Sequence, residues 1–210
     1  MFSLVVKSLR CSRGGRILIT DLSFALDAGD GLIVAGPNGA GKSTLLRALA
    51  GFHRADAGEI RVEGVEDGDD LGRHCAYVGH LNALKFSQTA EENLRFVAAY
   101  FGGRAGDVDA ALAQFGLESV ARIPAGYLSA GQKRRLSLCR LAIVRRPLWL
   151  LDEPTESLDA ASSAAFEAAA RRHRESGGLV VAATHAPFHI GAAYALDLGA
   201  EGFQMRRVAA

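Results

Sequence analysis

A chain of 210 residues, 49% of them hydrophobic, can bury a full core and fits one domain with an insertion better than two domains. Its 24 basic and 23 acidic side chains leave a net charge of +1, which argues against nucleic acid as a partner and against membrane binding by charge alone. The sequence contains no run of about 18 apolar residues, so it predicts no membrane span. Its three cysteines are widely spaced, which argues against a disulfide framework or a zinc ribbon.

The first part of the chain is predicted to be rich in β-strands. Short apolar runs separated by glycine-bearing turns predict these strands. The predicted strands are 2–9, 16–26, 31–36, 58–63 and 74–79. The acidic stretch at 66–70 predicts a solvated loop, because the glycines around it interrupt any periodicity.

A glycine-rich loop follows the third predicted strand. Residues 36–44 read GPNGAGKST and come directly after the apolar run 32–35. Such loops turn their backbone N–H groups toward phosphates, and their glycines adopt conformations that a Cβ would disfavour. We predict that Lys42 reaches the terminal phosphates and that Ser43 binds Mg²⁺, the alternative being a glycine-rich turn capped by Ser43. The predicted nucleotide-binding residues here are Gly36, Pro37, Asn38, Gly39, Ala40, Gly41, Lys42, Ser43 and Thr44.

From Thr89 onward the apolar spacing becomes helical, which predicts a helical insertion that a glycine pair at 102–103 divides. The elements predicted after it are a helix over 130–146, a strand over 148–151, a helix over 159–175 and a strand over 179–183. Strands and helices that alternate around a phosphate loop predict a parallel α/β sheet.

Two carboxylates follow the buried strand over 148–151. Asp152 and Glu153 lie at its C-terminal end, where open α/β sheets bind ligands, and Pro154 prevents further pairing. We predict that Asp152 holds Mg²⁺ through its water shell and that Glu153 orients or deprotonates the attacking water. The alternative is an acidic turn after a core strand.

The sequence LSAGQ at 128–132 leads into three basic residues at the start of a helix. Positive charges there oppose the helix dipole, so we expect an anion or an acidic neighbour beside 133–135. Ser129 and the backbone of Gly131 are candidate phosphate donors at the helix N-terminus. The alternative is an ordinary serine cap followed by a solvated basic face.

In this order and spacing the motifs resemble the ATP-binding cassette family over nearly the whole chain. GPNGAGKST is similar to Walker A, LSAGQ to the family signature, LWLLDEP to Walker B, 157–159 to the D-loop, and His185 to the switch histidine. The resemblance implies an α/β P-loop NTPase with a RecA-like core, an N-terminal antiparallel β subdomain and a helical insertion. It implies one nucleotide-binding domain over 1–210, with its helical subdomain at approximately 81–140.

The resemblance also implies an ATPase that uses ATP and Mg²⁺ and works as a head-to-tail homodimer. In such a dimer the ATP on one Walker A is capped by the partner's signature. The implied catalytic residues are Glu153, His185 and Lys42, the trans ATP contacts are Ser129, Gly131 and Gln132, and the D-loop residue is Asp159. Taken alone, His185 also fits a capping or core histidine after the strand over 179–183.

Two positions depart from the general family pattern. His80, in YVGHLNALK, occupies the place of the usual Q-loop glutamine, and an imidazole there still accepts or donates a hydrogen bond. Arg13, in CSRGGR, stands near the place of the usual adenine-stacking aromatic. A guanidinium stacks on bases, and an exposed loop arginine is the equal alternative.

Three longer segments point to a subfamily. LRCSRGGR at 9–16, GHLNALKFSQTAEENL at 79–94 and LSAGQKRRLSL at 128–138 resemble the ATPase subunit of the haem exporter of bacterial cytochrome c maturation. This resemblance implies an integral membrane permease subunit (CcmB-like), haem-handling maturation proteins as partners, and a peripheral position on the cytoplasmic face of the inner membrane. ATP hydrolysis would then be coupled to haem export or to release of a haem-loaded chaperone.

Other functions stay open at this point. One is the ATPase subunit of another small exporter of the same family, and another is a soluble nucleotide switch of that family. A GTPase or small-molecule kinase does not explain LSAGQ, and the Asn-Lys-x-Asp motif that reads guanine is absent. Leu81, Leu84 and Phe86 are candidates for a permease-docking groove, and core packing explains them equally well.

Overall fold

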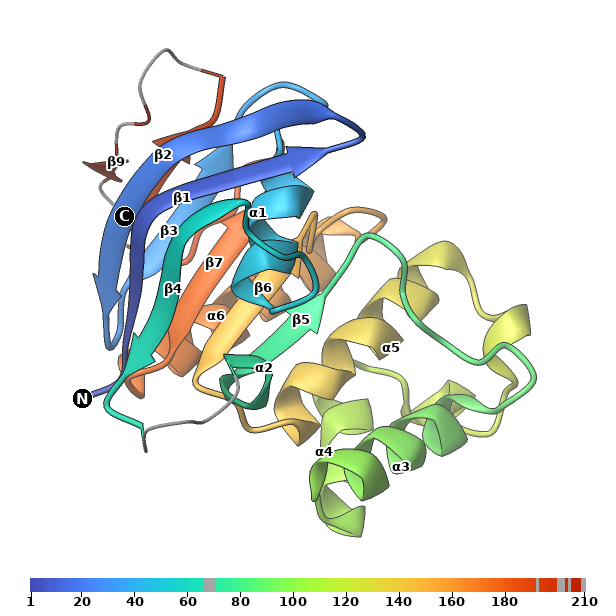
Figure 1. The fold of residues 1–210 in the computed structure, drawn as a ribbon. Helices are drawn as coiled ribbons and strands as arrows, with labels where there is room; N and C mark the ends of the chain where they lie inside the picture. The colour runs from blue at the N-terminus through green and yellow to red at the C-terminus, as the bar shows by residue number, and fades with distance from the viewer. Residues whose placement is uncertain (66–70, 192, 200–202, 204, 209–210) are drawn as a thin grey trace. The chain divides into compact units, whose positions relative to one another are not determined.

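The computed structural model describes residues 1–65, 71–191, 193–199, 203 and 205–208 (Figure 1). The acidic stretch at 66–70 therefore lies outside the described residues. The chain divides into two compact units. Unit 1 comprises Met1–Tyr77, Arg146–Pro154 and Glu167–Ala210, and unit 2 comprises Val78–Arg145 and Thr155–Phe166. Among the described residues, no helix combines the length and the apolarity needed to cross a bilayer.

A three-stranded antiparallel sheet, in the order β2-β1-β4, belongs to unit 1. Its strands are β1 (Ser3–Arg13), β2 (Arg16–Asp27) and β4 (Ala57–Glu63). Along β2 the buried residues alternate with exposed ones, as expected for a sheet with one face on a core. Gly14 and Gly15 both have positive φ and join β1 to β2 in a two-residue hairpin loop, so the first strand runs four residues past its predicted end.

A second sheet contains six strands in the order β5-β6-β7-β3-β8-β9. The strands are β3 (Gly31–Ala35), β5 (Cys75–Val78), β6 (Leu148–Asp152), β7 (Leu179–Ala183), β8 (Ala193–Asp197) and β9 (Met205–Val208). β6, β7, β3 and β8 run parallel, and β6 and β7 are buried at every position because both of their faces are covered. The mixed α/β fold with an antiparallel N-terminal sheet is therefore confirmed.

Helix α1 (Lys42–Leu49) packs against β1, β6 and β7. Its buried side chains, Leu45, Leu46 and Leu49, join the main hydrophobic core of unit 1. The helix begins directly after Gly41, its N-cap, within the glycine-rich motif. The loop is therefore joined without a spacer to a helix that is anchored in the core.

The core of unit 2 is formed by α3 (Ala90–Phe101), α4 (Ala105–Gln114) and α5 (Ala130–Ile143). Thr89 and Glu92 form a capping box that begins α3, and Gly102 ends it with φ 75°. α5 ends three residues before its predicted end, because Val144 is already extended ahead of Pro147. The short helices are α2 (Leu71–His74), η1 (Glu118–Val120) and η2 (Ala125–Tyr127). The longer helix α6 (Ala160–Glu175) is divided between the two units.

Two strands escaped prediction. β8 is a short run of mixed burial, and β9 contains adjacent arginines, Arg206 and Arg207, that are unusual in a strand. β9 lies at the edge of the sheet, where charged side chains discourage pairing with another chain. β8 pairs with β3, and β9 pairs with β8, so neither strand can be recognised from its own residues alone.

Candidate functional site

The glycine-rich loop connects β3 to α1 and turns through three positive φ values. Gly36, Gly39 and Gly41 have φ of 133°, 82° and 104°, conformations that side chains with a Cβ rarely adopt. Gly41 is the N-cap of α1 and provides no side-chain cap. The first turn of α1 therefore presents its backbone N–H groups without a competing side-chain acceptor, as a phosphate site requires.

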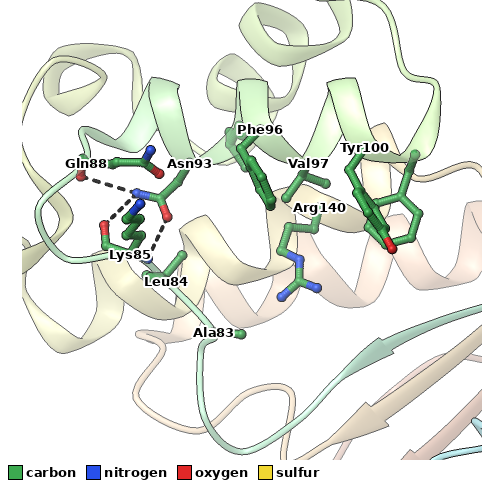
Figure 2. Close-up of a pocket in the computed structure, with 11 residues that line it drawn as sticks. Ala83, Leu84, Lys85, Gln88, Asn93, Phe96, Val97, Tyr100 and Arg140 are labelled. Carbon is green, nitrogen blue, oxygen red and sulfur yellow. Dashed lines mark hydrogen bonds between the residues drawn. The ribbon is translucent and has the colours of Figure 1, made fainter.

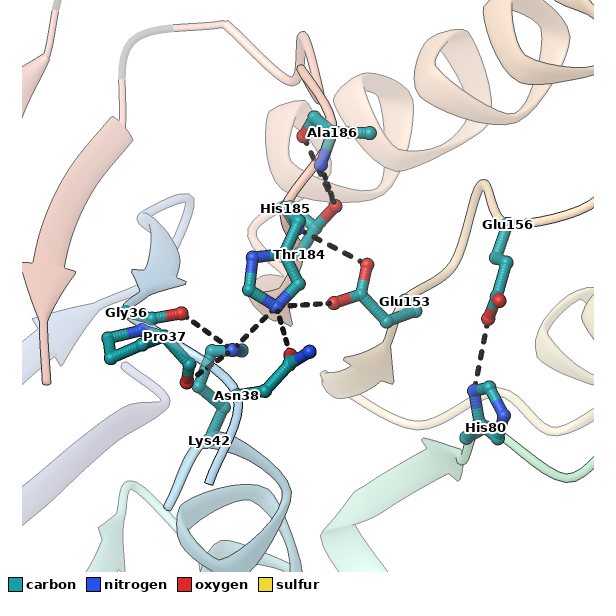
Figure 3. Close-up of polar contacts among 10 residues, drawn as sticks. All are labelled: Gly36, Pro37, Asn38, Lys42, His80, Glu153, Glu156, Thr184, His185 and Ala186. Carbon is teal, nitrogen blue, oxygen red and sulfur yellow. Dashed lines mark hydrogen bonds and ion pairs between the residues drawn. The ribbon is translucent and has the colours of Figure 1, made fainter. Parts of the chain in front are cut away.

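Lys42 is buried, and its ammonium group makes three contacts (Figure 3). Nζ donates to the carbonyl oxygens of Gly36 at 2.7 Å and Pro37 at 3.1 Å, and it lies 2.8 Å from Nε2 of His185. Asn38 Oδ1 lies 2.9 Å from the same Nε2. The loop and His185 are thus in direct contact.

The register of β6 against β7 brings Glu153 to His185. Asp152 lies opposite Ala183 in the parallel ladder, and the backbone N–H of Glu153 donates to the Ala183 carbonyl at 2.8 Å. The His185 N–H donates to Glu153 Oε2 at 3.2 Å, and Oε1 is 3.8 Å from Nε2 of His185. Glu153 has φ 48°, a conformation that is costly for a residue with a side chain and that concentrates at functional sites.

The strand order explains why these groups meet. β6, β7 and β3 are neighbours and parallel, so the segments that follow them leave the sheet at one edge. Asn38, Lys42, Glu153 and His185, which are far apart in sequence, are brought together there. The sequence placed Glu153 and His185 separately and did not predict that His185 would contact both Lys42 and Asn38.

Asp152 is buried at the end of β6, and Ser43 is half-buried at the start of α1. The Tyr77 hydroxyl lies near Asp152: burial raises the pKa of Tyr77, and the Asp152 charge adds to that rise. A hydroxyl and a carboxylate are hard oxygen donors of the kind that Mg²⁺ takes, usually with water and phosphate completing its shell. The described residues contain no cluster of three or more His, Cys, Asp or Glu, so a metal held by protein groups alone does not fit.

Ser129 is the N-cap of α5, so the serine cap considered as an alternative is present. Its Oγ accepts from the Gln132 N–H at 3.2 Å, and Gln132 Oε1 accepts from the Ser129 N–H at 2.8 Å, which completes a capping box. The signature residues therefore form a defined helix start within unit 2. A role toward nucleotide stays a prediction.

The three basic residues after the signature donate mainly to backbone carbonyls. Lys133 Nζ bonds to Gly126 O at 3.0 Å, Arg134 Nη1 to Gly79 O at 2.8 Å, and Arg135 Nη1 to Phe115 O at 3.0 Å. Arg135 also lies near Asp159, whose pKa it helps to lower. Asp159 is therefore the expected acidic neighbour of Arg135, and for Lys133 and Arg134 the expectation stays a prediction. These side chains fix loops of unit 2 by filling carbonyl acceptors.

Gly131 touches the predicted D-loop within unit 2. A Cβ added to Gly131 would lie 2.9 Å from the carbonyl oxygen of Ser157, closer than such atoms approach. Asp159 then caps α6, because its Oδ1 accepts from the Ser162 N–H at 2.7 Å. That hydrogen bond is the main cause that lowers the Asp159 pKa. Signature and D-loop are thus packed against each other.

The two departures from the family pattern are both on the surface. His80 Nδ1 lies 3.0 Å from Glu156 Oε2, in a pair whose side chains are 64% and 54% exposed (Figure 3). Exposed ion pairs contribute little to stability, so this contact does not by itself explain the histidine. Arg13 is exposed and lies opposite Arg16 in the β1–β2 hairpin.

Comparison with known proteins adds a family and close relatives. The family model described as ABC transporter matches residues 19–156. The "Cytochrome c biogenesis ATP-binding export protein CcmA" of Nitrobacter winogradskyi is 49% identical over 185 residues, 88% of this chain and 92% of that protein. The protein of the same name from Rhizobium meliloti is 44% identical over 201 residues, 93% of this chain and 97% of that protein.

Solved structures agree in fold. A chain described as the ATP binding subunit of an ABC transporter superposes with a TM-score of 0.82 at 24% identity, covering 96% of this chain and 89% of that chain. A putative ABC transporter ATP-binding protein from Pyrococcus furiosus gives a TM-score of 0.78 at 19% identity, covering 93% and 97%. At these identities the likeness is one of architecture.

Proposed function

Because the chain belongs to the ABC transporter family and is an ATP-binding ATPase, we propose that it powers the haem exporter of cytochrome c biogenesis. The observation that carries the proposal is the set of relatives with that export name, 43–50% identical over at least 88% of the chain. The site geometry supports the ATPase part, because the phosphate loop, the carboxylates after β6 and His185 lie at one edge of the sheet.

In the proposed reaction, Lys42 binds the terminal phosphates of ATP and the loop from Gly36 to Thr44 surrounds them with backbone N–H groups. Ser43 and Asp152 would hold Mg²⁺, which when bound neutralises phosphate charge. Glu153 accepts a proton from the attacking water, and His185 orients the γ-phosphate. The contact of His185 with both Lys42 and Glu153 supports this division of roles. Arg13 is proposed to stack on the base.

The functional unit is proposed to be a homodimer. Ser129, Gly131 and Gln132 of one copy would cap the ATP held by the other copy, and the D-loop residue Asp159 would line the same interface. The capping box at Ser129 supports this role, because it holds the signature in one conformation at the N-terminus of a 14-residue helix. His80 would take the Q-loop position.

We further propose that an integral membrane permease docks on unit 2 and holds the chain at the cytoplasmic face of the inner membrane. Leu81 and Phe86 are exposed, so core packing does not explain them, whereas Leu84 packs partly against the core and lines a groove (Figure 2). Exposed large apolar side chains of this kind are typical of a protein interaction surface.

The test is to delete the gene and to measure haem attachment to periplasmic c-type cytochromes. We expect attachment to fail, to return with the wild-type gene, and not to return with the Glu153→Gln variant. Normal cytochromes in the deletion strain would contradict haem export. Copurification of the chain with another exporter's permease would then favour that exporter, and absence from membranes would favour a soluble switch.

A further inference from the structure

The ammonium group of Lys42 has three close neighbours among the described residues (Figure 3). Its Nζ lies 2.7 Å from the carbonyl oxygen of Gly36, 3.1 Å from that of Pro37 and 2.8 Å from Nε2 of His185. An ammonium has three N–H donors, so these neighbours equal the donors in number. Lys42 is also buried, with 8% of its surface exposed. A phosphate oxygen that approaches Nζ must therefore take the place of one of the three groups.

Of these neighbours, His185 is the one that can move away without a movement of the backbone. The carbonyl groups of Gly36 and Pro37 belong to the loop itself, and the Pro37 oxygen also accepts from the Ala40 N–H at 3.2 Å. The side chain of His185 is 50% exposed. Exposed side chains change rotamer within nanoseconds. A phosphate that binds Lys42 is therefore expected to displace the imidazole of His185 and to leave the loop in place.

This displacement breaks more than the contact with Lys42. Nε2 of His185 also lies 2.9 Å from Asn38 Oδ1 and 3.8 Å from Glu153 Oε1. Glu153 Oε2 accepts from the His185 backbone N–H at 3.2 Å, which keeps the backbone beside the site while the ring turns. A hydrogen bond of ordinary strength corresponds to about 2- to 10-fold in affinity. A ligand that takes Lys42 from His185 therefore loses affinity unless it gives the imidazole a new partner.

ADP and ATP differ in this respect. In the proposed function, on which this inference rests, Lys42 binds the terminal phosphates and His185 the γ-phosphate. Both nucleotides take Lys42 from His185, but only ATP carries a γ-phosphate that offers the imidazole a new partner. We propose that His185 competes with the β-phosphate of ADP for Lys42, so that the site releases the product of hydrolysis more readily than it releases the substrate. Selectivity then arises from a contact within the protein that ADP breaks and does not replace.

The test measures, by isothermal titration, the affinity of the full chain for MgADP and for the magnesium complex of a non-hydrolysable β,γ-imido analogue of ATP. His185→Ala removes the competing group, so this variant should bind ADP about 2- to 10-fold more tightly than the wild type does. The analogue should gain less, because the same change removes its own contact with His185. The matched control is His189→Ala, since His189 is an exposed histidine of the same segment. Both of its affinities should equal those of the wild type.

Two further measurements follow the displacement itself. In a chain with isotope-labelled histidine, the ring resonances of His185 should shift when MgADP is added, whereas those of His189 should not. The resonances of His185 are assigned by their loss in His185→Ala. Differences in affinity between variants of one site are mostly differences in dissociation rate. A fluorescent ADP derivative should therefore leave His185→Ala more slowly than it leaves the wild type.

Unchanged ADP affinity in His185→Ala would overturn the inference, because His185 would then act on the γ-phosphate alone. Weaker ADP binding by this variant would overturn it as well, since His185 would then support the loop instead of competing with phosphate. Ring resonances of His185 that do not move at saturating ADP would show that no displacement occurs. Each of these results leaves the proposed ATPase intact. Failure of the wild-type chain to bind either nucleotide would instead contradict the proposed function.

Discussion

The polar side chains of the site around the glycine-rich loop in unit 1 bind one another, whereas those of the signature region in unit 2 bind the backbone. In unit 1, residues from three strand ends contact one another, so Lys42, Glu153 and His185 form a connected site within one chain. In unit 2, Ser129, Lys133, Arg134 and Arg135 are occupied with capping and with loop carbonyls. Polar side chains thus converge on one site in unit 1, whereas in unit 2 they hold the local backbone in place.

The sharpest way to test the chemical half of this comparison is Glu153→Gln. An amide keeps the shape but does not accept a proton, and a general base contributes about 10²–10⁴ in rate. We expect steady-state ATP hydrolysis to fall by about that factor while nucleotide stays bound, as measured by phosphate release and by retained nucleotide. Glu59→Gln is the control, since Glu59 is a surface residue paired with Arg61. Normal turnover by Glu153→Gln would remove this residue from the reaction.

Lys42→Ala should have the next largest effect, on binding rather than on rate. Two unit charges about 4 Å apart interact by about 4 kcal/mol at an effective dielectric near 20, which corresponds to about 10³ in affinity. The change also removes the contacts to Gly36, Pro37 and His185. Isothermal titration with MgATP measures the loss, and Lys7→Ala, an exposed lysine of β1, should bind normally. Wild-type affinity in Lys42→Ala would contradict the phosphate-loop assignment.

Gly131→Ala probes the surface built by unit 2. The added Cβ would meet the Ser157 carbonyl at 2.9 Å, so we expect a destabilisation of about 1–3 kcal/mol in the free energy of unfolding. Gly106→Ala, in α4 with nothing within 4 Å, is the matched control and should stabilise by about 0.5–1 kcal/mol. Chemical denaturation measures both. Equal stability of the two variants would argue against a tight contact between signature and D-loop.

The smallest effect concerns acid stability at Asp159. The Ser162 N–H, with help from Arg135, lowers the pKa of this carboxyl below its ordinary value. Its contribution to stability is therefore complete above the unfolded pKa of about 3.9 and is lost as the pH falls through the lower folded value. Asp159→Asn keeps an N-cap without a titrating group. Its thermal midpoint should fall less than that of the wild type below about pH 4, and parallel pH profiles would contradict this assignment.

Much of the fold could be read from the chain because its signals are local. The alternation of β2, the continuous burial of β6 and β7, and the cap at Thr89 are each visible within one segment. β8 and β9 were missed because their strand character depends on pairing with β3 and with each other. Short strands of mixed burial carry little periodicity of their own.

The residues of the site could be predicted from the sequence, but the contacts among them could not. Motif spacing placed Lys42, Glu153 and His185, and the order of the strands, which is not written in the chain, brought them into contact. The dipole argument did not foresee that Lys133 and Arg134 donate to carbonyl oxygens of distant loops, because such contacts depend on the fold.

Arg134 has a mechanical consequence. This guanidinium, buried in unit 2, ties the first turn of α5 to Gly79 O at 2.8 Å and to Asn82 Oδ1 at 3.3 Å, on either side of His80. Asn93 fastens the next stretch of the same segment to α3. A displacement of the segment around His80 would therefore move the first turn of α5, which carries the signature residues, because these hydrogen bonds connect the two.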